Sequence, residues 1–265
     1  MGEISEIIKK SRKIVVKIGS NVISDDGMVN KERLHNIVEQ VKHLIDMGKQ
    51  VVIVSSGAGA CGVGVLNKWG RRGDINYKQA LCAIGQVELM MAYKEYFGDY
   101  DIHVGQILLT GEDFGDHNRT LHIRNTLFTL IDEGIVPVIN ENDSVCVDEI
   151  NSIGDNDTLS ALTANLWSAD LLIIMSDIDG VFDKDPKTHA DAQLITKITN
   201  IDDTIGHIDT EGKSTFGTGG IVCKIEAARS VNQFGSDMIL LNGKKKDIII
   251  HALEGTEKGT LFACE

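Results

Sequence analysis

The stretch KIVVKIG, residues 13–19, is a nearly continuous run of β-branched residues that closes on a lysine and a glycine. Similar apolar runs follow along the chain: QVVIVSSG (50–57), IHVGQILL (102–109), IVPVIN (135–140) and DLLIIMSD (170–177). A run with little polar alternation indicates a strand that is covered on both faces. Segments with helical periodicity lie between or beside these runs, at 31–47, 77–97, 118–132 and 157–167.

This alternation predicts an α/β fold, a three-layer α/β/α sandwich around a mainly parallel sheet. Right-handed β-α-β crossovers place helices on both faces of such a sheet. The 265 residues are 42% hydrophobic, which is enough for a large core, and only two are prolines. Because no low-complexity stretch or charge run marks a linker, we expect a single domain over residues 1–265.

Composition argues against several classes of protein. A formal net charge of −13 disfavours nonspecific binding to nucleic acid or to anionic membranes, which requires clustered Lys and Arg. The five cysteines are an odd number without a CxxC pair, which predicts neither a disulfide framework nor a zinc site. No run approaches the roughly 20 apolar residues of a membrane span, and the N-terminus lacks a signal-peptide core. We therefore expect a cytoplasmic protein.

Polar residues follow the predicted strands, where parallel sheets usually bind ligands. They form four groups: residues 17–20, 55–59, 140–143 and 176–180. Two further groups precede predicted helices: residues 154–157, and a glycine-rich turn at 217–220 before a helix over 221–234 that contains Lys224. Backbone N–H groups of such turns, together with a nearby lysine, can hold phosphate oxygens.

The glycines of residues 57–62 also match GxGxxG, the dinucleotide-binding fingerprint. This match follows the second predicted strand, and no acidic residue stands at the end of a strand about 20 residues later. We therefore favour a cradle for phosphate or carboxylate oxygens over a dehydrogenase, with a plain tight turn as the alternative.

Other motifs of well-known enzyme classes are missing from the sequence. There is no Walker A motif, no HRD motif of protein kinases, no HExxH and no GxSxG. Residues 154–157 alone would be explained by capping of the next helix. The polar group at 140–143, directly after an apolar strand, is harder to explain without a ligand.

A series of motifs carries a resemblance to a known family. In chain order they are VVKIGS (15–20), VIVSSGA (52–58), HVGQILLT (103–110), PVINENDSV (137–145), GDNDTLSAL (154–162), MSDIDGVFDKDP (175–186) and GTGGIVCKI (217–225). Together they resemble the glutamate 5-kinases of the amino acid kinase family. PVINENDSV and GDNDTLSAL favour this group over relatives that act on acetylglutamate, aspartate, carbamate or uridylate.

Two departures from the family pattern are visible. Ile221 and Cys223 stand where the family usually has Met and Thr, and Cys61 and Gly62 change the loop that we expect after SSGA. Longer family members carry a C-terminal RNA-binding-like domain, and the chain resembles the short form without it.

The resemblance implies ATP-dependent phosphorylation of the side-chain carboxylate of L-glutamate to L-glutamyl 5-phosphate, the first step of proline biosynthesis. By this resemblance Lys17 and Lys224 bracket the transferring phosphoryl group, and Asp157 orients both ammonium groups. A general base is not required, because a carboxyl group with a pKa of about 4.3 is already ionised at neutral pH. Catalysis would consist of positioning and charge neutralisation.

The resemblance also assigns binding residues. Those implied for ATP and its phosphates are Lys17, Gly19, Gly57, Ser176, Asp177, Thr218, Gly219, Gly220, Ile221, Val222, Cys223 and Lys224. Those implied for glutamate are Ser56, Asn140, Asp143 and Asn156. Asp143 suits the ammonium group of the substrate. Mg²⁺ would be carried mainly by the ATP phosphates, without a metal site of the protein's own.

As partners, the resemblance implies a homo-oligomer (dimer or tetramer), feedback inhibition by proline, and hand-over of the product to glutamyl phosphate reductase. Two alternatives stay open at this point. One is an amino acid kinase for N-acetylglutamate or aspartate, and the other is a sensor that keeps the fold without turnover.

Overall fold

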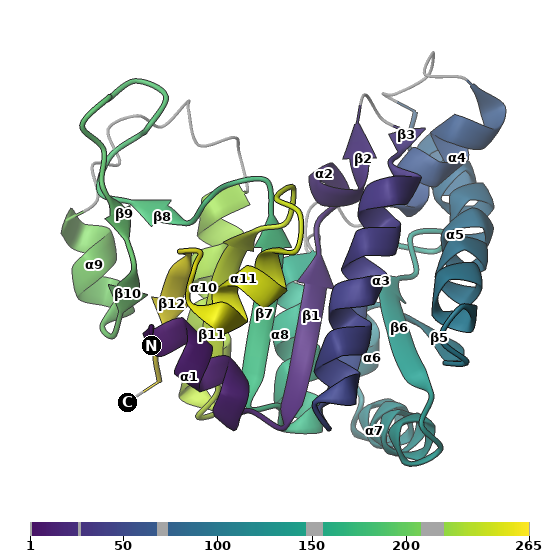
Figure 1. The fold of residues 1–265 in the computed structure, drawn as a ribbon. Coiled ribbons are helices and arrows are strands. Elements are labelled where there is room, and N and C mark those ends of the chain that lie inside the picture. Colours follow the sequence, from purple (N-terminus) through teal and green to yellow (C-terminus); the bar gives the residue numbers. More distant parts are fainter. Residues whose placement is uncertain (1, 26–27, 68–73, 147–155, 208–219, 265) are drawn as a thin grey trace.

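The computed structural model of the protein describes residues 2–25, 28–67, 74–146, 156–207 and 220–264 (Figure 1). A sheet with the strand order β10-β12-β11-β7-β1-β4-β6-β5 forms its centre. The parallel strands are β1 (Lys13–Ile18), β4 (Gln50–Ser55), β5 (Val104–Leu109), β6 (Val136–Glu141), β7 (Leu171–Ser176) and β11 (Asp237–Asn242). At one edge, β12 (Thr260–Phe262) runs antiparallel to β11 and pairs with β10 (Lys197–Ile198).

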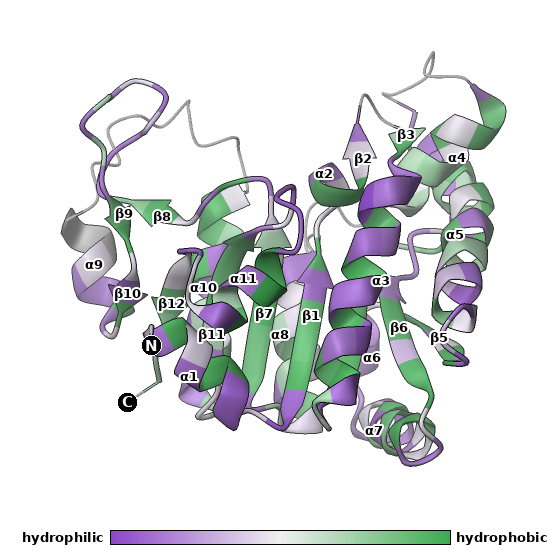
Figure 2. Ribbon diagram, in the orientation of Figure 1, coloured by the Kyte–Doolittle hydropathy of each residue, from purple (hydrophilic) through white to green (hydrophobic). Residues whose placement is uncertain are grey.

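Helices cover both faces of this sheet, which confirms the predicted three-layer α/β/α sandwich. One hydrophobic cluster joins the sheet to α1 (Glu3–Lys10), α3 (Lys31–Asp46), α5 (Ile75–Gly98) and α11 (Ile248–Glu254). A second cluster joins the opposite face to α7 (His117–Asp132), α8 (Asn156–Trp167) and α10 (Gly220–Gln233). Figure 2 shows the consequence, since the central strands are hydrophobic along most of their length.

The strand register brings the predicted ligand-binding positions to one edge of the sheet. In β1, Ile18 pairs with Ser55 of β4 on one side and with Met175 of β7 on the other. Leu109 of β5 pairs with Glu141 of β6 in the same way. The polar residues that follow β1, β4, β6 and β7 therefore lie next to one another, as expected from their place after parallel strands.

The smaller elements join this frame at its ends. They are α2 (Ser20–Ile23), β2 (Ser24–Asp25), β3 (Met28–Val29), α4 (Ala58–Leu66), α6 (Gly111–Gly115), β8 (Val181–Phe182), β9 (Leu194–Ile195) and α9 (Ile201–His207). The expected strands and helices are confirmed to within about two residues. The expectation of a loop after SSGA was wrong, because that segment is helix α4.

Helix α4 forms because its glycines allow an unusually close approach to α5. A Cβ atom on Gly62 would lie 2.0 Å from the carbonyl oxygen of Leu81, and one on Gly85 would lie 1.8 Å from that of Ala58. Both neighbours are backbone atoms, which cannot move aside as a flexible side chain could. The glycines of residues 57–62 therefore serve helix packing as well as the turn, which fixes α5 relative to the end of β4.

This contact leads to a prediction about stability. We expect Gly62→Ala to lower the free energy of unfolding by about 3 kcal/mol, since the added methyl group forces two helix backbones apart. Gly64→Ala is the matched control on the same helix, because a Cβ atom there has nothing within 4 Å. The control should be neutral or stabilising by up to about 1 kcal/mol. Urea unfolding of both variants measures the difference, and equal midpoints would contradict the packing argument.

Candidate active site

A buried cluster of three charged residues lies at the carboxyl end of β1. Lys17 Nζ is 2.5 Å from Asp157 Oδ1, and Lys224 Nζ is 3.0 Å from Asp157 Oδ2. Lys17 comes from β1, Asp157 from the first turn of α8 and Lys224 from α10. The structure thus brings together the three residues that the sequence predicts as catalytic, although they are far apart in the chain.

Burial makes this cluster electrostatically strong. The exposed fractions are 4% for Lys17, 7% for Lys224 and 0% for Asp157. Burial alone would raise the pKa of Asp157, but the ammonium groups of Lys17 and Lys224 outweigh it and hold that pKa below its usual range. Asp157 therefore stays ionised at neutral pH, and the three side chains together carry one net positive charge. Such a cluster suits an anionic ligand.

Two glycines lie in the turns that follow β1 and β4. The Cβ position of Gly19 is 3.8 Å from Lys17 Nζ and 3.2 Å from the carbonyl oxygen of Met175, to which the N–H of Gly19 donates at 3.1 Å. Gly57 precedes α4 with a φ of 107°, and a Cβ atom there would lie 2.5 Å from Ile23. Gly57 therefore favours glycine for reasons of conformation and space, and Gly19, with an extended backbone, for the tight space alone.

A network of amides connects three of the residues predicted to bind glutamate. Asn156 Nδ2 donates to Ser56 Oγ at 2.7 Å and to Asn140 Oδ1 at 3.0 Å. Asn140 Nδ2 in turn donates to Gln86 Oε1 at 2.8 Å, a buried contact with α5. Since Asn156 directly precedes Asp157, this network begins beside the charged cluster and runs away from it toward α5.

Asp143, the fourth residue predicted to bind glutamate, lies beyond the end of β6. Burial raises the pKa of Asp143 to about 6, and the nearby charge of Glu141 adds to this effect. A hydrogen bond with the thiol of Cys82 acts in the opposite direction. The structure leaves this carboxylate in a place where a positively charged partner would be favourable.

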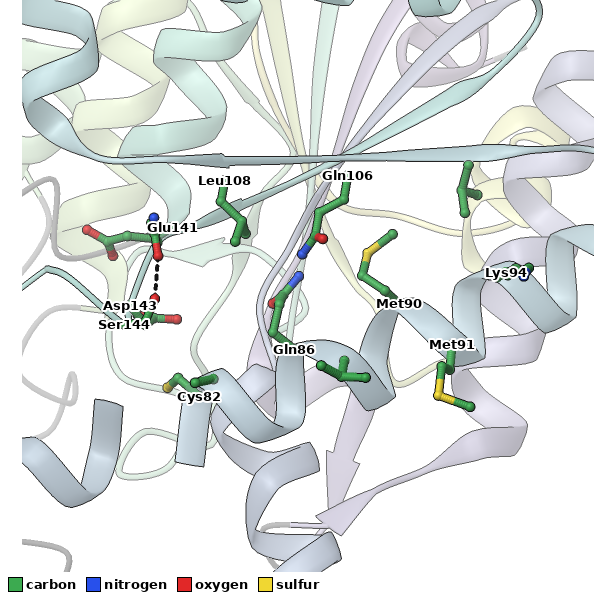
Figure 3. Close-up of a pocket in the computed structure, with 14 residues that line it drawn as sticks. Cys82, Gln86, Met90, Met91, Lys94, Gln106, Leu108, Glu141, Asp143 and Ser144 are labelled. Carbon is green, nitrogen blue, oxygen red and sulfur yellow. Dashed lines mark hydrogen bonds between the residues drawn. The ribbon is translucent and has the colours of Figure 1, made fainter. Parts of the chain in front are cut away.

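A cleft of about 540 Å³ lies between α5, β5 and the turn after β6. Figure 3 shows its walls: Cys82, Gln86, Met90 and Met91 come from α5, and Gln106 and Leu108 from β5, with Asp143 at one end. The lining residues do not include Lys17, Asp157 or Lys224. The cleft therefore adjoins the amide network on the side away from the lysines.

Two of the residues predicted to hold ATP follow β7. Ser176 Oγ donates to Asp177 Oδ1 at 3.4 Å, and Asp177 Oδ2 accepts from Asn21 Nδ2 at 3.2 Å. In the first turn of α10, Gly220 accepts a hydrogen bond from Lys224 Nζ at 2.8 Å, and Val222 is 61% exposed. Ile221 and Cys223 are half-buried. The predicted ATP contacts Thr218 and Gly219 lie outside the described residues.

Cys82 and Gln86 line the cleft and were not among the residues predicted from the sequence. They lie four residues apart on α5, so both face the end of β6. The available signal was a pair of polar residues at helical spacing within a segment that is otherwise explained by core packing.

The described residues provide neither a cluster of metal ligands nor a helix that could span a membrane. Within it, no group of three or more His, Cys, Asp and Glu side chains could hold a metal ion. None of the helices in the described ranges combines the length and apolar character needed to cross a membrane.

Sequence comparison shows which known proteins the chain resembles. The model of the amino acid kinase family matches residues 12–242. Glutamate 5-kinase of Alkaliphilus metalliredigens is 59% identical over 260 residues, which cover 98% of both chains. Glutamate 5-kinase of Geobacter metallireducens is 46% identical over 257 residues, which cover 97% of this chain and 69% of that longer protein.

Solved structures with the same fold are more distant in sequence. UMP kinase from Ureaplasma parvum superposes with a TM-score of 0.65 at 15% identity, covering 96% of this chain and 99% of that one. Carbamate kinase from Giardia lamblia bound to AMP-PNP gives a TM-score of 0.67 at 13% identity, with coverage of 96% and 99%. At this level of identity the likeness concerns the fold alone.

Proposed function

Because the chain belongs to the amino acid kinase family, we propose that it catalyses the reaction of its glutamate 5-kinase relatives, the transfer of the γ-phosphoryl group of ATP to the side-chain carboxylate of L-glutamate. The product is L-glutamyl 5-phosphate, which enters proline biosynthesis. The observation that carries this proposal is the buried cluster of Lys17, Asp157 and Lys224 beside the amides of Asn140 and Asn156. One part suits phosphate oxygens, and the other suits an amino acid.

In the proposed reaction an oxygen of the glutamate carboxylate forms the new P–O bond, while the bond between the γ-phosphorus and the bridging oxygen of ADP breaks. No proton has to be removed, because the carboxylate is already ionised at neutral pH. The task of the protein is to hold the reacting oxygen in line and to compensate charge that moves onto the leaving diphosphate. Lys17 and Lys224 supply that charge, and Asp157 fixes the position of both ammonium groups.

The binding roles follow the same geometry. We assign Ser56, Asn140, Asp143 and Asn156 to glutamate, with the carboxylate of Asp143 facing the substrate's ammonium group. Gly19, Gly57, Ser176, Asp177 and the first turn of α10 are assigned to ATP and its phosphates. Mg²⁺ would neutralise phosphate charge, and we propose that it is held mainly by the phosphate oxygens, as this ion commonly is.

We further propose a cytoplasmic enzyme with one domain over residues 1–265. It would form a homo-oligomer, respond to proline as a feedback inhibitor, and pass its labile product to glutamyl phosphate reductase. These points extend the resemblance and are separate from the reaction itself.

The test is an acceptor comparison with purified protein, ATP and Mg²⁺. L-Glutamate, N-acetyl-L-glutamate and L-aspartate are supplied in parallel, and acyl phosphate is trapped with hydroxylamine. We expect hydroxamate from L-glutamate alone. N-Acetyl-L-glutamate lacks the free α-amino group that would pair with Asp143, and the side chain of L-aspartate is one methylene shorter, so its carboxylate would fall short of the lysines when its ammonium group lies at Asp143. Product from N-acetyl-L-glutamate or L-aspartate alone would keep the fold and the lysine cluster but refute the proposed substrate.

A further inference from the structure

The hydrogen bonds around Asn140 fix the direction of the whole amide network. The backbone N–H of Glu141 donates to Asn140 Oδ1 at 2.8 Å, and a backbone N–H can only donate. The other amide atom of Asn140 is therefore its NH₂ group, so the contact with Gln86 must run from Asn140 Nδ2 to Gln86 Oε1. This assignment follows from the network rather than from an arbitrary choice of amide orientation.

The same assignment leaves Gln86 Nε2 as a donor without a hydrogen-bond partner in the described part of the chain. Gln86 is 9% exposed, and its Nε2 is buried without a hydrogen-bond partner among the described residues. The side chain lines the cleft between α5 and β5, where its amide points toward that of Gln106 (Figure 3). Buried polar atoms are rarely left unpaired, so a buried donor at a cleft wall indicates a ligand with an acceptor atom.

At the other end of the network an acceptor is left over. Asn156 uses its Nδ2 for Ser56 and Asn140, and its Oδ1 is buried without a partner among the described residues. Asn156 adjoins Asp157 and the lysines, whereas Gln86 is the member farthest along the network from them. The network therefore has a defined polarity and a defined direction away from the phosphoryl-transfer residues.

We propose that Gln86 binds the substrate directly, with its Nε2 donating to the α-carboxylate of glutamate. This inference rests on the proposed function and adds a residue to it. The reacting γ-carboxylate must lie near Lys17 and Lys224, so the α end of the molecule lies toward Gln86. The α-carboxylate of glutamate would then accept from Gln86, and its ammonium group would face the opposite charge of Asp143.

The packing of α5 holds Gln86 in place for this role. Gly85, its neighbour, lies in backbone contact with Ala58, so α5 cannot shift without breaking its contact with α4. Cys82, one turn earlier, interacts with Asp143. One helix face thus positions both the proposed carboxylate donor and the carboxylate that faces the ammonium group.

Gln86→Glu separates direct binding from a structural role. The new side chain keeps an oxygen that accepts from Asn140, but it replaces the donor at the cleft by a second acceptor. At pH 8.5, where the introduced carboxyl group is ionised, we expect the KM for glutamate to rise roughly tenfold to a hundredfold, because a charge-assisted hydrogen bond is replaced by repulsion. The KM for ATP should stay within about twofold of wild type.

A substrate analogue identifies which end of glutamate is affected. 4-Aminobutyrate lacks the α-carboxylate and keeps the reacting carboxylate and the ammonium group. The ratio of kcat/KM for glutamate over 4-aminobutyrate should therefore fall at least about tenfold in Gln86→Glu. An equal loss for both compounds would overturn the proposal, because it would show a general disturbance of the site.

Two further variants complete the test. Ala80→Glu adds the same charge at an exposed position of the same helix outside the cleft and should change the KM for glutamate by less than about threefold. Gln86→Met removes both hydrogen bonds and should also raise this KM, which keeps the proposal testable if the first variant fails to fold. A raised KM for glutamate in Gln86→Met together with wild-type kinetics in Gln86→Glu would show that Gln86 only positions Asn140.

Absence of hydroxamate from glutamate with the wild-type protein would instead refute the proposed function itself.

Discussion

Lys224→Met is expected to lower kcat about a thousandfold and to change the KM for glutamate by much less. The ammonium group of Lys224 is buried and is bound to Asp157 at 3.0 Å. In the proposed reaction it compensates charge that moves onto the leaving diphosphate in the transition state. Preorganised charges of this kind typically contribute two to four orders of magnitude to turnover. Steady-state kinetics of hydroxamate formation, with both substrates varied, measures the effect on kcat and on each KM separately.

The matched control is Lys13→Met on β1, four residues before Lys17. Lys13 lies at the opposite end of the strand, where its Nζ donates to the carbonyl oxygen of Trp167. That variant should retain kcat within about threefold, whatever its effect on stability. Wild-type turnover in Lys224→Met, or an equal loss in Lys13→Met, would contradict the role of the cluster in phosphoryl transfer.

Lys224 is a better target than Asp157 for this test because of the charge balance in the cluster. Asp157 is fully buried between two ammonium groups, so removing it leaves two buried positive charges without their shared partner. Breaking a buried pair in this way typically costs 3–5 kcal/mol of stability. A loss of activity in an Asp157 variant would therefore mix folding with catalysis, whereas Lys224→Met leaves the pair of Asp157 and Lys17.

The fold was predictable because its strands are covered on both faces. KIVVKIG and DLLIIMSD have few polar positions, and each ends at a polar residue that the register then brings to one edge of the sheet. The run DMILLN, which forms β11, has the same character and could have been predicted by the same rule. Helix α4 could not, because AGACGVG has low helical propensity and is helical through its contact with α5.

The cluster of three charged residues was predictable as a group of side chains that lie together. Lys17, Asp157 and Lys224 occur in polar motifs at element boundaries, and the structure brings them together. Gln86 lies inside a long helix whose pattern is explained by core packing. Only the direction of the hydrogen bonds around Asn140 shows that this side chain leaves a donor at the cleft.

The ionised carboxylate of Asp143 has opposite effects on the stability of the unliganded fold and on the proposed binding of glutamate. The lysine cluster is balanced internally by Asp157. At Asp143, burial raises the pKa most, the like charge of Glu141 adds to this effect, and the hydrogen bond with the thiol of Cys82 opposes it. Its raised pKa means that the ionised form is disfavoured by folding. A bound ammonium group would relieve this cost, so the carboxylate is a feature that favours binding at the expense of the unliganded fold.

Asp143→Asn tests that competition, with expected effects of opposite sign on binding and on stability. Loss of the charge paired with the substrate's ammonium group should raise the KM for glutamate roughly a hundredfold, with the KM for ATP nearly unchanged. In the wild type, kcat/KM for glutamate should fall as the pH decreases through about 6, where Asp143 becomes protonated. The variant should lose this pH dependence. Equal effects on both KM values would remove Asp143 from the glutamate site.

The stability effect follows from the direction of the pKa shift. The folded-state pKa of about 6 lies above the ordinary value of 3.8 for an aspartate side chain, so the folded protein binds the proton more tightly. The resulting stabilisation is present below about pH 4 and is lost as the pH rises through about 6. At pH 7 the ionised carboxylate therefore costs on the order of 3 kcal/mol, because a difference of one pKa unit corresponds to about 1.4 kcal/mol. Asp143→Asn removes this cost, while its amide oxygen can still accept from Cys82. We expect Tm at pH 7 to rise by roughly 3–6 °C, and the exposed Asp132→Asn to change neither Tm by more than about 1 °C nor the KM for glutamate. A lower Tm in Asp143→Asn would mean that this carboxylate stabilises the fold, and that its raised pKa is not a cost accepted for binding.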